Sequence, residues 1–379
     1  MSRKIKTRLD PITFEVFRGT FDYIPQVMAK VMQKAAFSPI INDQVDLSVS
    51  IYDDKVQLIG QTANCPIQLA AMHFSAEASV RKYGRENLHE GDIIILNDPY
   101  NGGTHLPDVT FTKPIFYKNK LIAFAVSRAH WTDLGGGGPG GLGFGTHVAA
   151  EGLRIPPTKI VKKGKIDTEI RDIIRNNTRT PEYIDGDIHA HIGSCNAAEN
   201  EILRLAKRYG PETLHTAMED VLNYTEALTR KAIESWPEGK YEGYAEQECD
   251  GITPEPVNVN VTLEVKGDEL TVDFTGTHKQ VQGSINSPMS NTYGAVYYSL
   301  IMFLAPNAPA NAGMYRPIKI ILPDDCWLNA KWPGPTIGCT TTAASKIMTA
   351  IWAALAKCIP DKVIGVTYAE ENWIATSIR

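Results

Sequence analysis

The 379-residue sequence lacks the features of a membrane protein, a disulfide-rich protein or a nucleic-acid-binding protein. No window approaches the roughly 18 consecutive apolar residues that a membrane-spanning helix needs. The six cysteines are widely spread without a C-x-x-C pair, which favours reduced thiols over a disulfide framework. A net charge of −5 argues against nucleic acid or an anionic membrane as the main partner, because phosphate binding needs a basic surface. We therefore expect a cytoplasmic protein, and the charged N-terminus gives no sign of a signal peptide.

Several common catalytic motifs are also missing. No G-x-x-x-x-G-K-[ST] loop occurs, so the chain has no recognisable ATP-binding cradle of its own. No G-x-S-x-G nucleophile elbow occurs, and no His stands at a recognisable distance from Cys65 or Cys339. The run GGGGPGGLGFG (135–145) formally contains G-x-G-x-x-G, but no helix is expected to begin there, so we do not interpret it as a dinucleotide fingerprint. It can be a lid, a close backbone approach to substrate or a plain surface loop.

The hydrophobic periodicity predicts a mixed α/β (α+β) protein with more than one domain. The expected helices are 11–37, 66–84, 196–236 with a break at 210–211, 290–304 and 340–357. The expected strands are 47–54, 56–61, 92–98, 121–130, a hairpin over 257–277, and 318–322. Pro25 should kink or divide the first helix. We place a soft boundary near 210–240, with buried strands and helices in residues 1–235 and the hairpin plus helices in 236–379.

Two segments of the N-terminal part carry a His-x-x-Asp pattern beside glycines, close behind an apolar run. They are NDPYNGGTHLPD (97–108) and SRAHWTDLGGGG (127–138). His and Asp are good ligands for zinc, manganese or iron, and glycine lets the backbone approach a ligand closely. The candidate ligands are His105, Asp108, His130, Asp133 and, just before a strand, Asp46. The alternative is structural, since a lone His at a strand end is usually satisfied within the fold and an Asp after proline is a common turn former.

Two further histidine-containing stretches are less specific. His147 and Glu151 lie four residues apart, so on a helix they would share a face and could supply a ligand or an acid/base group. Alternatively, Glu151 caps a turn or pairs with Arg154. His189 and His191 would diverge if the segment is helical, which favours a structural role.

The motifs resemble those of the hydantoinase B family, and they occur in the same order. The most specific are NDPYNGGTHLPDVTFTKPIF, AHWTDLGGGGPG and EGLRIPPTKI, followed by DFTGTHKQVQGSINSP and NAGMYRPI. The resemblance runs from about Asp10 to about Val366. The family includes the B subunits or halves of ATP-dependent hydantoinases, 5-oxoprolinases and caprolactamase, and one subunit type of acetone and acetophenone carboxylases.

The resemblance implies a division of labour between subunits. A hydantoinase A-type partner binds ATP with Mg and phosphorylates the small-molecule substrate, or bicarbonate in the carboxylases. The B-type chain holds a divalent metal, for which zinc, manganese and iron are all suitable. The implied ligands are His105, Asp108 and His130, with Asp46 as a further ligand or a bridge to a second ion. Asp133 would then hold His130 in the right tautomer, and Asp133, His147 and Glu151 are the candidate catalytic residues.

The sequence departs from the family pattern at two places. Where relatives usually read Thr-Glu-Ile-Phe-Gln-Glu-Gly, residues 146–152 read THVAAEG, a change that could reshape the pocket or give His147 a new role. Family members also normally continue beyond the final IATSIR, so we expect that the usual C-terminal extension is absent or supplied as a separate subunit.

Three functions are compatible with these observations. The first is the metal-bearing catalytic subunit of an ATP-dependent amidohydrolase that opens a cyclic amide, such as a hydantoin, 5-oxoproline or a lactam. The second is a subunit of an ATP-dependent ketone carboxylase. The third is a non-catalytic scaffold paralogue within such a complex.

Overall fold

The computed structural model describes residues 7–62, 64–68, 70–142, 145–304 and 308–365. Its N-terminal part contains α1 (Pro11–Ala35), α2 (Pro39–Asn42), α3 (Ala71–Tyr83), α4 (Thr168–Arg175), α5 (Pro181–Tyr209) and α6 (Pro211–Glu234). The strands of that part are β1 (Leu47–Asp53), β2 (Leu58–Gln61), β3 (Ile93–Leu96), β4 (Asp108–Tyr117), β5 (Lys120–His130), β6 (Thr158–Lys162) and β7 (Lys165–Ile166). The C-terminal part contains β8 (Gly239–Gln247), β9 (Val257–Lys266), β10 (Glu269–Asp273), α7 (Met289–Leu304), α8 (Ala312–Tyr315), β11 (Ile318–Ile321) and α9 (Thr342–Cys358). The protein is therefore mixed α/β, as expected.

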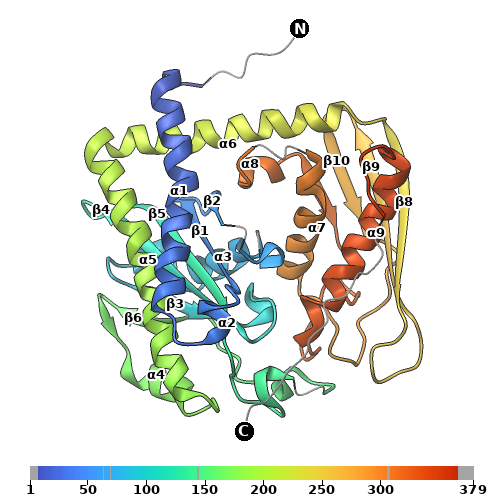
Figure 1. Cartoon of the computed structure of the whole chain (residues 1–379), viewed down its shortest axis with the longest axis horizontal. Helices are drawn as coiled ribbons and strands as arrows, with labels where there is room; N and C mark the ends of the chain where they lie inside the picture. The colour runs from blue at the N-terminus through green and yellow to red at the C-terminus, as the bar shows by residue number, and fades with distance from the viewer. Residues whose placement is uncertain (1–6, 63, 69, 143–144, 305–307, 366–379) are drawn as a thin grey trace.

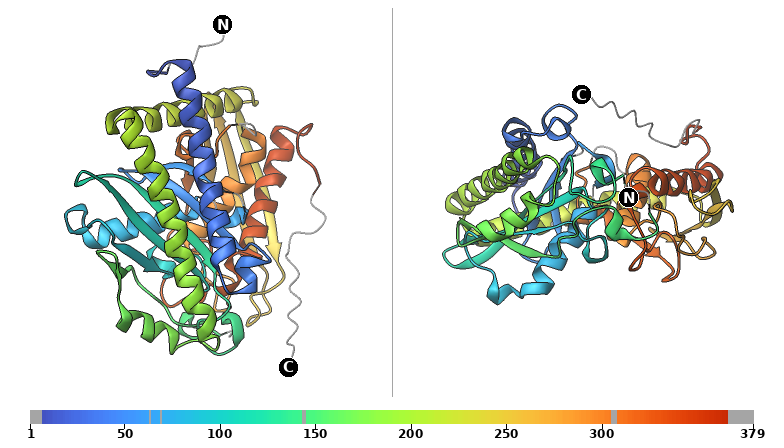
Figure 2. Two further views of the ribbon diagram at one scale, coloured as in Figure 1. Left: turned by 60° about the vertical axis from the view of Figure 1, so that its left-hand side comes forward. Right: turned by 90° about the horizontal axis from the view of Figure 1, so that it is seen from below.

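The strands of the N-terminal part form one antiparallel sheet in the order β2-β1-β5-β4-β3-β6-β7. Successive side chains of a strand point to opposite faces. On one face, residues such as Val49 and Phe111 pack with α1 and α5, which lie side by side across the sheet (Figure 2). On the other face, Phe124 and Val126 pack with Met72 of α3. Because helices cover both faces, β3 and β5 are near-continuous apolar runs, which confirms the sequence-based expectation.

The face toward α3 also carries a row of buried polar side chains. In the β4–β5 ladder, Asp108 is the direct partner of His130, and Thr110 is the direct partner of Arg128. All four side chains are buried. The register of this one strand pair therefore places an acid, an imidazole and a guanidinium next to one another at the edge of the hydrophobic core.

The first helix is continuous, although the sequence suggested a kink or a division at Pro25. The side chain of Asp10 caps it by accepting hydrogen bonds from the backbone N–H groups of Ile12 and Thr13. Pro25 does not divide α1, which continues to Ala35 with Pro25 on its buried side.

Helix α5 begins at Pro181, well before the helical segment expected from residue 196. His191 therefore lies on a helix face that packs into the core, where its ring stacks on Phe111. Trp131 Nε1 donates to His191 Nε2, so Nδ1 carries the proton that meets Ser127 Oγ. Burial lowers the pKa of His191 to about 3, which keeps the ring neutral. His191 therefore has a structural role, as the sequence favoured.

The C-terminal part is built on the expected hairpin of β9 and β10, with the turn at Gly267 in the left-handed region. The sheet order is β11-β10-β9-β8, and β11 is parallel to β10. Helix α9 packs on this sheet and α7 packs on α9. The buried members of their hydrophobic cluster lie within residues 233–359, whereas the buried members of the N-terminal clusters end at residue 222. Helix α6 spans the two parts (Figure 1). A division into two domains near residue 235 stays a prediction.

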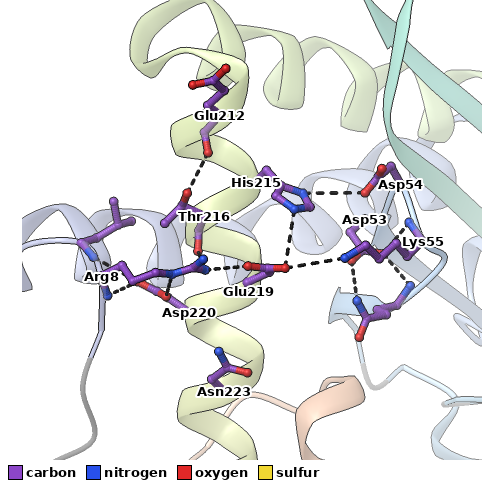
Figure 3. A network of polar contacts seen from close by, with 12 residues as sticks. Arg8, Asp53, Asp54, Lys55, Glu212, His215, Thr216, Glu219, Asp220 and Asn223 are labelled. Carbon is purple, nitrogen blue, oxygen red and sulfur yellow. Dashed lines mark hydrogen bonds and ion pairs between the residues drawn. The ribbon is translucent and has the colours of Figure 1, made fainter.

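A polar network fastens α6 to the start of the chain and to the β1–β2 turn (Figure 3). The buried carboxylate of Asp220 accepts hydrogen bonds from the backbone N–H groups of Arg8 and Leu9 and from Arg8 Nε. Glu219 pairs with Arg8 at 2.8 Å and with Lys55 of the turn at 3.6 Å. These bonds fix the position of α6, and so of the bridge between the two parts.

Within the described ranges, no helix combines the length and the apolarity needed to cross a membrane. The six cysteines all lie in those ranges and form no disulfide bond. The extreme N-terminus and the closing IATSIR, on which the expectations about a signal peptide and about the chain end rest, lie outside the described residues.

Candidate metal centre

The structure brings three of the candidate ligands together. One ligand atom each from His105, Asp108 and His130 lies within 4.8 Å of the other two, and all three side chains are buried. Asp108 begins β4 and His130 ends β5, so the strand register sets one side of the cluster. A tight turn sets the other, because the N–H of Asp108 donates to the carbonyl of His105. His105 Nε2 consequently lies 3.2 Å from Asp108 Oδ1.

The orientation of His105 is fixed from the C-terminal part of the chain. Its Nδ1 lies 2.9 Å from the carbonyl oxygen of Ile337, 232 positions away. A carbonyl can only accept, so Nδ1 carries a proton and Nε2 is the nitrogen that faces Asp108. A ligating histidine usually donates its second N–H to a backbone carbonyl or a carboxylate in this way.

Asp108 is the electrostatic centre of the cluster. Its Oδ1 lies 3.6 Å from His130 Nδ1 and 3.3 Å from Gln68 Nε2, while Oδ2 accepts a hydrogen bond from Thr104 Oγ1. Burial opposes its charge, but the neighbouring imidazoles hold the pKa of this carboxyl well below its usual range. Burial likewise favours neutral His105, yet the Asp108 carboxylate raises the pKa of His105 to about 9. A divalent ion would therefore displace a proton when it binds.

Asp46 lies at the rim of the cluster. Its Oδ2 is 3.9 Å from His130 Nδ1, and its side chain is 25% exposed. Burial raises the pKa of Asp46 above its usual value. Gln68 Nε2 donates to Asp46 at 3.1 Å as well as to Asp108. Neither Gln68 nor Thr104 was identified from the sequence, and nothing in its local pattern marks Gln68.

Asp133 serves the glycine-rich loop. Its buried carboxylate accepts hydrogen bonds from the backbone N–H groups of Gly135, Gly140 and Arg179, and from the Arg179 guanidinium at 2.8 Å. Burial favours the neutral acid, but these donors lower the pKa of Asp133 below its usual value. His130 Nδ1 lies near Asp108 and Asp46. The expected role of Asp133 as the partner of His130 stays a prediction.

His147 and Glu151 do not share a helix face, because residues 148–150 form one short 3-10 turn. His147 Nδ1 caps that turn by accepting from the N–H of Ala149, and its ring packs edge-on against Trp332. His147 lies outside the three-residue cluster. Arg154, the alternative partner of Glu151, pairs with Asp98 at 3.6 Å and lies over the Trp332 ring.

Glu151 acts on the cluster through one residue, Ile337. Its buried Oε1 accepts from the backbone N–H groups of Thr336 and Ile337 at 2.7 and 2.8 Å. Burial raises the pKa of Glu151 to about 7. Because the Ile337 carbonyl accepts from His105, the Glu151 carboxylate holds the segment that orients His105.

The side chains present fit a divalent metal ion. Two imidazoles and one carboxylate, buried and converging, form a donor set that zinc, manganese and iron accept, and Asp46 offers a further oxygen at the edge. The hydrogen bond to Ile337 leaves His105 Nε2 directed at the cluster, as a metal ligand requires.

Comparison with known proteins gives one family. The Hydantoinase B/oxoprolinase model matches residues 10–379. The B subunit of a putative D-/L-hydantoinase from a Pseudomonas species is 32% identical over 372 residues, which cover 94% of this chain and 63% of that protein. The beta subunit of the caprolactamase of Pseudomonas jessenii is 31% identical over 357 residues, which cover 94% of this chain and 61% of that protein.

Solved structures agree with this result. The crystal structure of the ATP-dependent caprolactamase from Pseudomonas jessenii superposes with a TM-score of 0.89 at 31% identity, covering 94% of this chain and 62% of that one. Nucleotide-free acetone carboxylase superposes with a TM-score of 0.84 at 18% identity, covering 93% of this chain and 49% of that one, which shows a shared fold alone. The chain spans less than two thirds of the length of these relatives.

Proposed function

The chain belongs to the hydantoinase B/oxoprolinase family, and we propose that it is the metal-bearing subunit of an ATP-dependent enzyme that opens a cyclic amide. The substrate class is a hydantoin, 5-oxoproline or a lactam. The observation that carries the proposal is the buried cluster of His105, Asp108 and His130, in which the Ile337 carbonyl directs His105 Nε2 inward. It stands in a chain that is similar over most of its length to one subunit of a caprolactamase.

The proposed enzyme is heteromeric and cytoplasmic. Two of the relatives are named as subunits, and this sequence has no phosphate-binding loop for ATP. We therefore assign ATP and Mg to a hydantoinase A-type partner that phosphorylates the small-molecule substrate.

The metal proposed is zinc, manganese or iron, held by His105, Asp108 and His130, with Asp46 as an additional ligand. Such an ion polarises a carbonyl or phosphoryl oxygen or lowers the pKa of a bound water. The chain itself supplies orientation. Ile337 sets the tautomer of His105, Thr104 holds one oxygen of Asp108, and the Gln68 amide spaces the carboxylates of Asp108 and Asp46.

The proposed roles of the three candidate catalytic residues follow from their partners. Glu151 is a positioning residue, because its Oε1 already accepts two backbone N–H groups. Asp133 holds the glycine-rich loop through Gly135, Gly140 and Arg179. His147 caps a turn and packs against Trp332. We assign it a structural role on the basis of these contacts.

Ring opening is tested with the chain co-purified with its A-type partner. The complex is assayed with ATP and, separately, with a hydantoin, 5-oxoproline and caprolactam, with His105→Ala and His130→Ala as variants. We expect ATP-dependent ring opening of at least one substrate, requiring both subunits and lost in both variants. Incorporation of bicarbonate into a ketone without any ring opening would instead identify a carboxylase, and normal ring opening by both variants would contradict the metal-centre assignment.

A further inference from the structure

A buried guanidinium lies next to the metal centre, where the Asp108 carboxylate interacts with it electrostatically but its hydrogen bonds go to other groups. Arg128 is fully buried on β5, two residues before His130 and on the same sheet face. Its Nε donates to Thr110 Oγ1 at 2.8 Å, and its Nη2 donates to Ser75 Oγ at 2.8 Å and to the Gly102 carbonyl at 3.3 Å. These acceptors are all neutral. Within the part of the chain that the structure describes, Nη1 has no hydrogen-bond partner.

Such an arrangement is unusual in a folded protein. Buried charges are normally paired, and buried donors are nearly always bonded, because an unpaired charge or donor away from water destabilises the native state. Arg128 departs from the second rule, because Nη1 is unbonded although Nε and Nη2 are held by three segments. The Asp108 carboxylate acts on the guanidinium electrostatically and is shared with two imidazoles. A guanidinium that is held in place with an unbonded donor is suited to bind an oxygen of a ligand.

The second feature is the start of α9, which lies beside the same centre. The carbonyl of Ile337 orients His105. Ile337 begins a 3-10 turn that ends at Cys339, and α9 begins three residues later at Thr342. Thr341 occupies the N-cap position but makes no side-chain capping bond. The first N–H groups of a helix have no intrahelical partners and carry the positive end of its dipole, so they attract anions. Residues 340–342 are partly exposed, which gives a ligand access.

A short chain of contacts connects Arg128 with the start of α9. Arg128 bonds the carbonyl of Gly102, and the next carbonyl, of Gly103, accepts from Ser290 Oγ of α7. The neighbouring Asn291 donates to the carbonyl of Cys339 at 2.9 Å. The Arg128 guanidinium also interacts electrostatically with the Asp108 carboxylate and, more weakly, with the Cys339 thiol at the start of α9.

The charges around the centre favour an anion once an ion is bound. A divalent ion and Arg128 together exceed the two carboxylates of Asp108 and Asp46 by one positive charge when both imidazoles and the buried Glu151 are in their neutral forms. The start of α9 adds to this positive potential. A water molecule would satisfy Arg128 Nη1 as a hydrogen-bond donor but would leave this charge in place.

We propose that Arg128, assisted by the N-terminus of α9, binds an oxyanion of the substrate beside the metal centre. The inference rests on the proposed function for the identity of the anion, which is a phosphoryl group added at the expense of ATP or a carboxylate of the substrate itself. Both present oxygens that a guanidinium and helix N–H groups recognise.

The test measures binding of inorganic phosphate and of acetate to the full chain loaded with Mn²⁺. Titration calorimetry gives the affinity, and enhanced ³¹P relaxation reports that phosphate lies near Mn²⁺. We expect Arg128→Met to weaken binding at least tenfold and Arg128→Lys to weaken it less. Lys113→Met is the matched control, because Lys113 is also buried on this sheet but is paired with Glu199. It should leave anion binding unchanged. Stronger binding of phosphate than of acetate would assign a phosphoryl group, and the reverse would assign a carboxylate.

A second pair of variants tests the inference if the Arg128 variants do not fold. Thr341→Asp places a carboxylate at the N-cap, so it should keep or raise the melting temperature while weakening anion binding. Thr341→Asn caps without the charge and should weaken binding less.

The outcomes separate this inference from the proposed function. If the chain holds its metal but binds neither anion, or binds them equally in native protein and both Arg128 variants, the inference is wrong and the metal centre stands. If the native chain holds no metal, the proposed function fails. The native and Arg128→Met proteins are then compared without metal, where equal affinity again overturns the inference and a tenfold difference supports it.

Discussion

Glu151 and His105 are joined through a single residue: the Ile337 N–H donates to Glu151 Oε1 at 2.8 Å, and the Ile337 carbonyl lies 2.9 Å from His105 Nδ1. The nitrogen of His105 that faces Asp108 is thus directed by a segment of the C-terminal part, which the buried Glu151 side chain holds in place. The centre depends on both parts of the chain, although its candidate ligands all come from the N-terminal part.

The first prediction concerns metal affinity. Replacement of Glu151 by Ala leaves the buried N–H groups of Thr336 and Ile337 without an acceptor, each at a cost of roughly 1–3 kcal/mol. We expect the released segment to weaken metal binding by about tenfold or more, as loss of an outer partner usually does. Glu151→Gln keeps an oxygen that accepts both bonds, so it should bind metal within about threefold of the native chain. Competition with a chromogenic chelator measures both, and equal affinity of the Ala variant and the native chain would refute the positioning role.

The second prediction concerns pH and stability in the metal-free chain. Burial raises the pKa of Glu151 to about 7, so the folded state prefers the protonated acid. The contribution of this group to stability is fully present below the unfolded-state pKa, near 4.5, and is lost as the pH rises through about 7. Relative to Glu151→Gln, the native chain should therefore lose on the order of 3 kcal/mol of unfolding free energy across this interval. Urea titrations of both proteins at several pH values measure the difference, and a pH-independent difference would contradict the assignment.

The third prediction separates Asp133 from the metal centre. Its carboxylate accepts from Gly135, Gly140 and Arg179, so Asp133→Ala should loosen the base of the glycine-rich loop. We expect unchanged metal content, faster proteolytic cleavage within residues 134–142, and a loss of roughly 1–3 kcal/mol of stability. Elemental analysis and limited proteolysis measure the two effects. Metal loss with a protease-resistant loop would restore the role as partner of His130 that the sequence suggested.

Much of the centre could be predicted from sequence because its ligands sit at the ends of apolar runs. His105 and His130 were placed near strand ends by this criterion, and the hairpin at Gly267 followed from strict alternation. The strand that begins at Asp108 was not predicted, since Pro114 within it interrupts a typical strand pattern. Its register with β5 nevertheless decides that Asp108 faces His130.

Other features depend on contacts that no local pattern encodes. Gln68 reaches Asp46 and Asp108 from a short turn, and Ile337 reaches His105 across 232 positions. The early start of α5 was missed because its first turns contain a glycine and several residues of low helix propensity. Gly186 is required there, since a Cβ at this position would come within 2.1 Å of the Phe37 ring.

The most direct test of the central claim is the metal content of the native full-length chain beside His105→Ala, His130→Ala and the control His189→Ala. His189 lies exposed on α5 and bonds only its own helix, at the carbonyl of Asp185. The metal-centre proposal predicts at least one divalent ion per chain in the native protein and the control, and loss of that ion in both ligand variants. A folded native chain without metal, or full metal content in His105→Ala and His130→Ala, would contradict it.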